Sequence, residues 1–448
     1  MTYALLTIHI GPIVRIRPYE VHINDPAFGD TFFGSGTERM DKYAGHRDQF
    51  GMPESTFNTI DHDLHKLRRG AIGPYFSRRS IIALESMLQE KIEKVCSRLE
   101  GFRSSGEPVD LRLLFSCFTT DVITEYAFPH SFNLLDTPDL APAWRNTFST
   151  GLRNFHWFKH FPVLWKVLRS IPDNLMLKLA PEMKLTIDWE RGNQRLIRGI
   201  LDSYDPNNKK ASHPTIFHEI LGSDLPPQEK SFERLWQEGE SIIGGGVETT
   251  ANTFNVIMFN LLTHPEQLAH IKKELHTAIP TRGSPTSWSL LEGLPYLSAV
   301  ISEGLRVAMG VTSRFIHVAP NRDLVYKTWV IPAGTAVSMK SWSTYLTYPQ
   351  HLFPAGKNKH QQSCVHLVQI EQNSIIPSHR YSIPRNASKP YTHTPRPLPN
   401  FLHLRLDLEV RRRRRLHGPH PPIHANNRAI DIGTKGTAFV TQQHLSSL

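Results

Sequence analysis

Apolar residues recur at helical spacing along much of residues 1–354, and this pattern predicts a mainly helical protein. Residues 294–309 form one apolar stripe through Leu297, Val300, Ile301 and Leu305. Residues 263–280 carry a similar stripe behind Pro265, a residue that suits a first helical turn. Residues 61–77 begin with acidic side chains, which favour a helix N-terminus, and stop near Gly73-Pro74. We therefore expect helices that pack on helices.

Two segments alternate between apolar and polar residues as β-strands do. The first is IVRIRPYEVHI, residues 13–23. The second, residues 322–339, has short runs rich in β-forming residues around a Pro-Ala-Gly turn. The predicted fold class is mainly α with a small β-sheet.

The segment GGGVETT, residues 244–250, interrupts an otherwise apolar helical pattern. Glycine inside a helix costs roughly 1 kcal/mol relative to alanine, so three together need a reason. One reading is a bulge over a flat cofactor, with Glu248 and Thr249 placed to relay protons. The other is a close helix crossing in which the threonines bond back to the preceding turn. The segment alone leaves both readings open.

Two charged pairs have spacings that place their members on one helix face. Glu303 and Arg306 are three residues apart within an apolar stripe, which predicts an at least partly buried ion pair. His65 and Arg69 are four residues apart and can point at one anion, although these residues alone favour a solvated basic face.

Charge divides the chain into two parts. The net charge is +10, and residues 355–448 contain 14 Lys and Arg against 4 Asp and Glu, whereas the preceding residues balance at 37 against 37. The same segment contains five consecutive arginines, residues 411–415, and many histidines and prolines. We predict a folded body, residues 1–354, and a basic tail, residues 355–448.

The three cysteines, Cys96, Cys117 and Cys364, are far apart and odd in number, which argues against a disulfide framework and favours a reducing compartment. Charges at Arg15 and Arg17 interrupt the first apolar run early, so no membrane anchor or signal peptide is expected.

Taken in order, these motifs resemble the cytochrome P-450 family of haem-thiolate monooxygenases, in particular the fungal branch of trichodiene-oxygenase-like enzymes. GGVETT resembles the family's oxygen-activating helix, and SEGLR, residues 302–306, its Glu-x-x-Arg helix. Residues 55–77 resemble the helix that contacts the haem propionates. The resemblance covers Gly11 to Pro354.

The resemblance implies roles for individual residues. Thr249, with Glu248, would deliver protons to bound dioxygen, and Gly245 and Gly246 would make room for it beside the haem. The remaining implied roles are haem-propionate binding by His65, Arg69 and Arg314, substrate contact by Val311, Thr312 and Ser313, and structural support by Glu303 and Arg306.

The family's thiolate loop, Phe-x-x-Gly-x-Arg-x-Cys-x-Gly, does not match the sequence around Cys364. The expected Phe, Gly, Arg and final Gly are replaced by Lys357, His360, Gln362 and His366. The family's later arginine, which completes the Glu-x-x-Arg pair, has no clear counterpart either. We therefore identify no metal ligand. We interpret the tail as disordered or as an aberrant product of a frameshift, a retained intron or a mispredicted exon.

The predicted function is haem-dependent insertion of one oxygen atom from dioxygen into a hydrophobic small molecule of fungal secondary metabolism. Electrons would come from an NADPH-dependent reductase. Intact relatives are expected at the endoplasmic reticulum membrane, and this chain, which shows no anchor, in the cytoplasm. The alternatives are a catalytically dead, truncated or frameshifted family member, a histidine-ligated protein, and a non-enzymatic protein whose basic tail binds nucleic acid or an acidic surface. Aromatic residues are sparse in the tail, so base stacking is not indicated and nucleic acid is the less expected partner.

Overall fold

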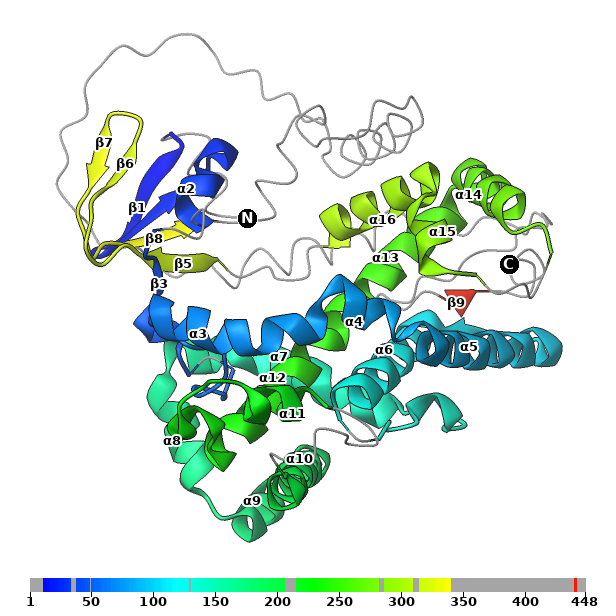
Figure 1. Ribbon diagram of the computed structural model, residues 1–448, viewed down its shortest axis with the longest axis horizontal. Coiled ribbons are helices and arrows are strands. Elements are labelled where there is room, and N and C mark those ends of the chain that lie inside the picture. Colours follow the sequence, from blue (N-terminus) through cyan, green and yellow to red (C-terminus); the bar gives the residue numbers. More distant parts are fainter. Residues whose placement is uncertain are drawn as a thin grey trace, which may run out of the picture. The chain divides into compact units, whose positions relative to one another are not determined.

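The computed structural model describes residues 11–33, 38–48, 50–128, 130–205, 215–281, 286–308, 314–339 and 439–440. All of them belong to one compact unit, which comprises residues 1–367 and 432–448. Helices make up most of the described chain (Figure 1). They are α2 (Gly29–Phe33), α3 (His62–Ile72), α4 (Arg78–Ile82), α5 (Glu85–Ser105), α6 (Leu111–Ala127), α7 (Pro142–His160), α8 (Pro162–Ser170), α9 (Asp173–Leu179), α10 (Lys184–Ser203), α11 (Ile216–Gly222), α12 (Phe232–Gly246), α13 (Glu248–Thr263), α14 (Pro265–Ala278), α15 (Trp288–Glu292) and α16 (Pro295–Ala308).

Five short strands form a mixed sheet in the order β1-β2-β8-β5-β3. They are β1 (Ile13–Arg17), β2 (Glu20–Ile23), β3 (Asp41–Lys42), β5 (Phe315–Val318) and β8 (Ala336–Met339). β2 runs parallel to β8, with Val21 opposite Val337, and the other pairs are antiparallel. Two smaller sheets pair β6 (Leu324–Tyr326) with β7 (Trp329–Ile331), and β4 (Val109–Asp110) with β9 (Phe439–Val440).

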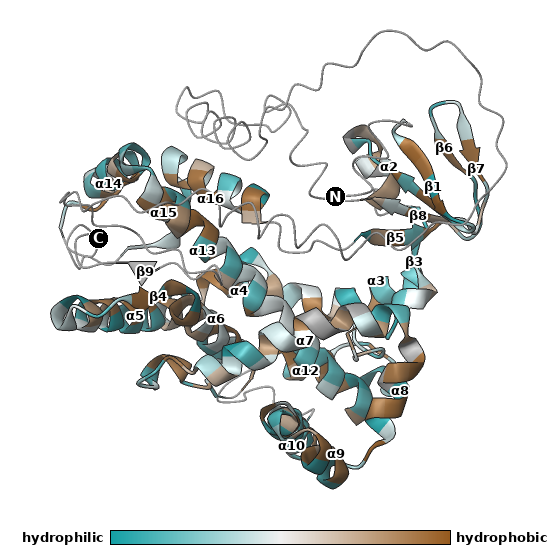
Figure 2. Cartoon of the chain, turned by 180° about the vertical axis from the view of Figure 1, so that it is seen from behind, coloured by the Kyte–Doolittle hydropathy of each residue, from teal (hydrophilic) through white to brown (hydrophobic). Residues whose placement is uncertain are grey.

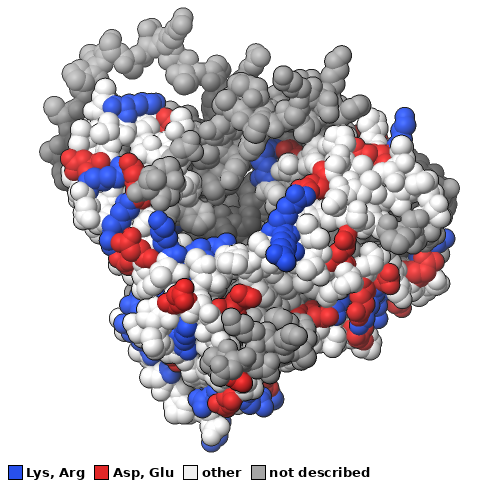
Figure 3. All heavy atoms as spheres, viewed as in Figure 1, with Lys and Arg blue, Asp and Glu red and all other residues white. Residues whose placement is uncertain are grey.

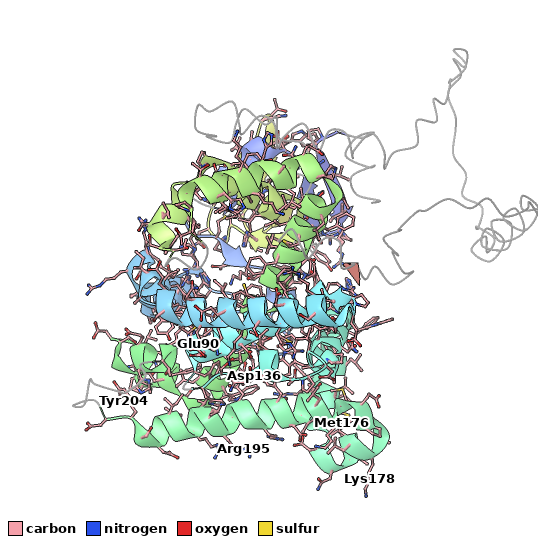
Figure 4. All side chains as sticks on the ribbon, turned by 90° about the vertical axis from the view of Figure 1, so that its right-hand side faces the viewer. Glu90, Asp136, Met176, Lys178, Arg195 and Tyr204 are labelled. Carbon is pink, nitrogen blue, oxygen red and sulfur yellow. The ribbon has the colours of Figure 1, made fainter. Side chains whose placement is uncertain are left out.

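The helical core is built around α6, which packs against α5, α12 and α13. α10 contributes an amphipathic face, since Ile197 and Ile200 are buried against α12 residues such as Trp236. On the opposite side of α10, Arg195 points away from the helices, as Lys178 does from α9 (Figure 4). Because α6 has neighbours on several sides, it buries polar residues such as Thr120 and Asp121 as well as apolar ones such as Leu114.

The elements expected from the hydrophobic pattern are confirmed, and so is the fold class. α3 begins where the acidic residues predicted it, because the Asp61 carboxylate accepts a hydrogen bond of 2.8 Å from the Leu64 amide. The Pro-Ala-Gly turn joins β7 to β8, and Gly334 adopts a φ of +78° there, which favours glycine. Residues 340–438 and 441–448 lie outside the described part, so the predicted boundary at residue 355 and the character of the tail remain predictions.

Not every helix buries its apolar residues. α8 exposes Val163 at 70% and Val167 at 51%, and Figure 2 shows its brown, apolar surface. Within the described residues, no helix combines the length and the hydrophobicity that a membrane crossing requires.

Candidate functional site

A helix break lies in the segment GGGVETT. α12 ends at Gly246, Val247 has φ −78° and ψ −78°, and α13 begins at Glu248. The interruption follows from the low helix propensity of consecutive glycines. The interruption that the glycine run predicts in this helix is therefore present as a break between two helices.

The three glycines differ in what surrounds them. Among the described residues, a Cβ atom added at Gly244 or Gly245 would meet nothing within 4 Å, whereas one at Gly246 would lie 2.8 Å from Cγ1 of Ile123 on α6. Features of both readings thus coexist in one turn, because Gly246 permits a close helix crossing while Gly244 and Gly245 border open space. The resemblance expects Gly245 and Gly246 to make room for dioxygen, and of these two only Gly245 borders open space, since Gly246 lies against Ile123.

Glu248 and Thr249 are adjacent in sequence but have different partners. The Thr249 hydroxyl donates a hydrogen bond of 2.6 Å to the Gly245 carbonyl, the back-bonding expected in the second reading. The Glu248 carboxylate accepts a hydrogen bond of 3.3 Å from the Ser116 hydroxyl of α6. It also lies 3.8 Å from the guanidinium of Arg145 on α7. Neither Ser116 nor Arg145 is marked by a local sequence motif.

His65 lines a cavity of about 220 Å³ beside α3. Figure 3 shows Lys and Arg side chains, in blue, around the hollow next to this helix. The side chains that line the cavity are Phe33, Glu38, Met40, Lys42, Ile60, His62, His65 and His317. Lys42 and His317 come from β3 and β5, so only the folded chain brings them to His65.

Three basic groups of this cavity, His65, His317 and Lys42, have lowered pKa values. Burial lowers the pKa of His65 to about 4, and the positive charges of Lys42, His62 and Arg69 contribute in the same direction. Burial also lowers the pKa of His317 to about 4 and that of Lys42 to about 8. An anion in the cavity would favour the protonated form of each group. The arrangement therefore suits an anionic ligand group such as a carboxylate.

Arg68 and Arg69 have opposite environments on α3. Arg69 is exposed, close enough to His65 to affect its pKa. Arg68, which sequence reasoning passed over, is 5% exposed and binds the Glu229 carboxylate at 2.5 Å. It also donates to the Thr59 hydroxyl at 2.8 Å. Arg68 is thus a structural residue that ties α3 to the turn before α12.

The other predicted residues lie away from the His65 cavity or outside the described chain. Arg314 forms an ion pair of 3.2 Å with the buried Glu20 and is absent from the cavity lining. Glu303 and Arg306 form the expected half-buried pair on α16, at 2.6 Å. Val311, Thr312 and Ser313 lie outside the described residues.

The described residues fit a haem group only in part. The open side of Gly244 and Gly245 suits a flat group, and the His65 cavity suits carboxylates. The two described cysteines do not suit a thiolate ligand. Burial raises the pKa of Cys117 to about 12, and its thiol donates to the Leu140 carbonyl, while Cys96 is exposed on α5. Cys364 lies outside the described residues.

Comparison with known proteins finds fungal relatives of this chain. A cytochrome P450 monooxygenase of Ascocoryne sarcoides, MO6277, is 43% identical over 355 residues, which are 77% of this chain and 68% of that protein. The monooxygenase TRI4 of Fusarium sporotrichioides is 35% identical over 345 residues, 77% of this chain and 65% of TRI4. The chain thus spans about two thirds of the length of these relatives.

The fold comparison points in the same direction. The crystal structure of a cytochrome P450, CYP102L1, superposes with a TM-score of 0.59 at 14% identity, over 78% of this chain and 74% of that chain. The family model of cytochrome P450 matches residues 13–350. The chain belongs to the cytochrome P450 family.

Proposed function

We propose that this chain is a haem-dependent monooxygenase that inserts one oxygen atom from dioxygen into a hydrophobic small molecule of fungal secondary metabolism. The observation that carries the proposal is the helix break, at which the Thr249 hydroxyl bonds to the carbonyl of Gly245, a residue that borders open space among the described residues. The family relatives, which are fungal monooxygenases, support it. Bound haem would supply the iron at which dioxygen is activated.

The chain's own residues would bind the cofactor's carboxylates and manage protons. Lys42 and Arg69 would attract the carboxylates by charge, whereas His65 and His317, which are neutral near pH 7, would donate hydrogen bonds to them. Glu303 and Arg306 would hold α16, whose Gly304 lies against Ile257 of α13. Arg314 is less suited to the same carboxylates than predicted, because its pair with Glu20 already engages it.

Proton transfer would use Thr249 and Glu248. The hydroxyl hydrogen of Thr249 is directed to the Gly245 carbonyl. The hydroxyl oxygen of Thr249 can therefore accept a hydrogen bond from a donor, such as water, on the open side. Glu248, which contacts Ser116 of α6 and Arg145 of α7, would supply the proton through water.

Substrate and partners are part of the same proposal. Val311, Thr312 and Ser313 would line the substrate side, and an NADPH-dependent reductase would supply electrons. Docking at the endoplasmic reticulum, where intact fungal relatives are expected, remains a proposal. The tail is proposed to have no role in nucleic-acid binding.

Thr249→Val tests the proton role. With the haem-loaded full chain, a reductase, NADPH and 7-ethoxycoumarin as probe, we expect dealkylated product to fall by about 100-fold, the lower range for loss of a proton-transferring group, while peroxide release per NADPH rises. Thr250→Val is the matched control, because Thr250 is exposed on the next position of α13. Equal product from Thr249→Val and Thr250→Val would refute the role of Thr249.

A further inference from the structure

One face of α6 fits the helix break between α12 and α13. Thr119 donates a hydrogen bond of 3.1 Å to the carbonyl of Val247, the residue at the break. Ile123, one turn further along α6, fills the space beside Gly246. Ser116, one turn before Thr119, donates to the Glu248 carboxylate at 3.3 Å. Residues at this spacing share one helix face, so α6 contacts the break through three successive turns.

Arg145 of α7 approaches Glu248 from another helix. Its Nη2 atom lies 3.8 Å from Oε2 of Glu248, while Ser116 engages Oε1. The two carboxylate oxygens are therefore engaged by two different helices. Both charged side chains are mostly buried, with exposed fractions of 21% for Arg145 and 15% for Glu248. Solvent screens such a pair less than one on an open surface.

We propose that Ser116 and Arg145 are positioning residues for Glu248, which hold its carboxylate at the helix break and set the direction in which it can pass a proton. The catalytic role of this positioning rests on the proposed function. The contacts of Ser116 and Arg145 with the Glu248 carboxylate, in contrast, are present in the chain without cofactor. The position of α7 would then affect proton delivery by Glu248, because a shift of α7 would move the Arg145 guanidinium that contacts one oxygen of the Glu248 carboxylate.

A purely structural role makes a different prediction. If Ser116 and Arg145 only joined helices, their loss would lower the stability of the chain without a specific change at the Glu248 carboxylate. If they position the carboxylate, their loss frees it to rotate and to meet reagents in solution. The chemical reactivity of Glu248 separates the two roles.

The experiment measures carboxylate labelling by a water-soluble carbodiimide and glycine ethyl ester in the full chain without added haem, read by peptide mass spectrometry. We expect Arg145→Gln and Ser116→Ala each to raise the labelling rate of Glu248 by about two- to fivefold, the range for loss of one partly exposed polar contact. Arg145→Lys should return the rate toward that of the parent chain, because it keeps the charge.

The control is the exposed pair of Arg103 with Glu100 on α5, whose atoms are 3.1 Å apart. Arg103→Gln should leave the labelling rate of Glu100 unchanged, since solvent already reaches this carboxylate. Ser116→Ala is the milder variant and keeps the test valid if Arg145→Gln unfolds, which circular dichroism would report. Unchanged Glu248 labelling in folded Ser116→Ala and Arg145→Gln, or no rescue by Arg145→Lys, would overturn the proposal.

The result is separable from the proposed function. If labelling rises as expected but Glu248→Gln leaves the ratio of product to peroxide unchanged, the positioning stands and the proton role of Glu248 is wrong. If labelling is unchanged while Glu248→Gln lowers that ratio, the proton role stands and the positioning is wrong.

Discussion

Arg68→Met is expected to lower the free energy of unfolding by about 3 kcal/mol, because it leaves the buried Glu229 carboxylate without its main partner. The loss of one member of a buried ion pair costs roughly 3 to 5 kcal/mol. The lower end applies here, since Arg234 remains 3.3 Å from the same carboxylate. Urea unfolding followed by tryptophan fluorescence measures the change.

Arg69→Met is the matched control, because the two arginines are neighbours on α3 and only Arg68 is buried. An exposed substitution of this kind changes stability by less than about 0.5 kcal/mol. Equal destabilisation by both variants would show that Arg68 does not form the buried network described above.

Gly246→Ala and Gly244→Ala are expected to change stability in opposite directions. At Gly246 the new methyl group would lie 2.8 Å from Cγ1 and 3.1 Å from Cβ of Ile123, so the α6 contact must shift, at a cost of about 1 to 3 kcal/mol. At Gly244 the methyl group meets nothing within 4 Å in the part of the chain that the structure describes, and alanine's higher helix propensity contributes up to about 1 kcal/mol of stabilisation.

The unfolding midpoints of these two variants, measured side by side without haem, test whether the glycines serve different purposes. A stabilised Gly246→Ala variant would contradict the close crossing with α6. A destabilised Gly244→Ala variant would contradict the open space on that side of α12.

Local patterns predicted the helices and the position of the break well. Helical periodicity and the acidic start of α3 depend on neighbours in sequence, and the structure confirms the helix start at Asp61 and the helix α16. Ile301 and Leu305, two members of the apolar stripe predicted on α16, are nevertheless exposed. The glycine run likewise marked the break, although the sequence alone left two readings and the structure contains features of both.

Long-range partners could not be predicted from sequence. The difference between Arg68 and Arg69 arises because Glu229, 161 positions away from Arg68, packs against one side of α3. Lys42 and His317 reach His65 only because β3 and β5 pair in the sheet. These contacts depend on tertiary packing. A single residue gives no repeating pattern in the sequence from which its distant partner could be predicted.

Two of our predictions exclude each other: that the chain is an active monooxygenase, and that its tail is an aberrant product. The proposed monooxygenase needs a thiolate ligand, and Cys364 is the one cysteine outside the described residues. An aberrant tail, in contrast, would leave the chain without that ligand, because the sequence around Cys364 departs from the family's loop at four positions.

The carbon monoxide difference spectrum of the reduced full chain, expressed with a haem precursor, decides between them. The proposed function predicts a thiolate-type band that Cys364→Ser abolishes, which would also refute the interpretation of the tail as aberrant. Failure to bind haem, or a histidine-type band, would contradict the proposed monooxygenase and identify the chain as a family member that has lost its catalytic ligand.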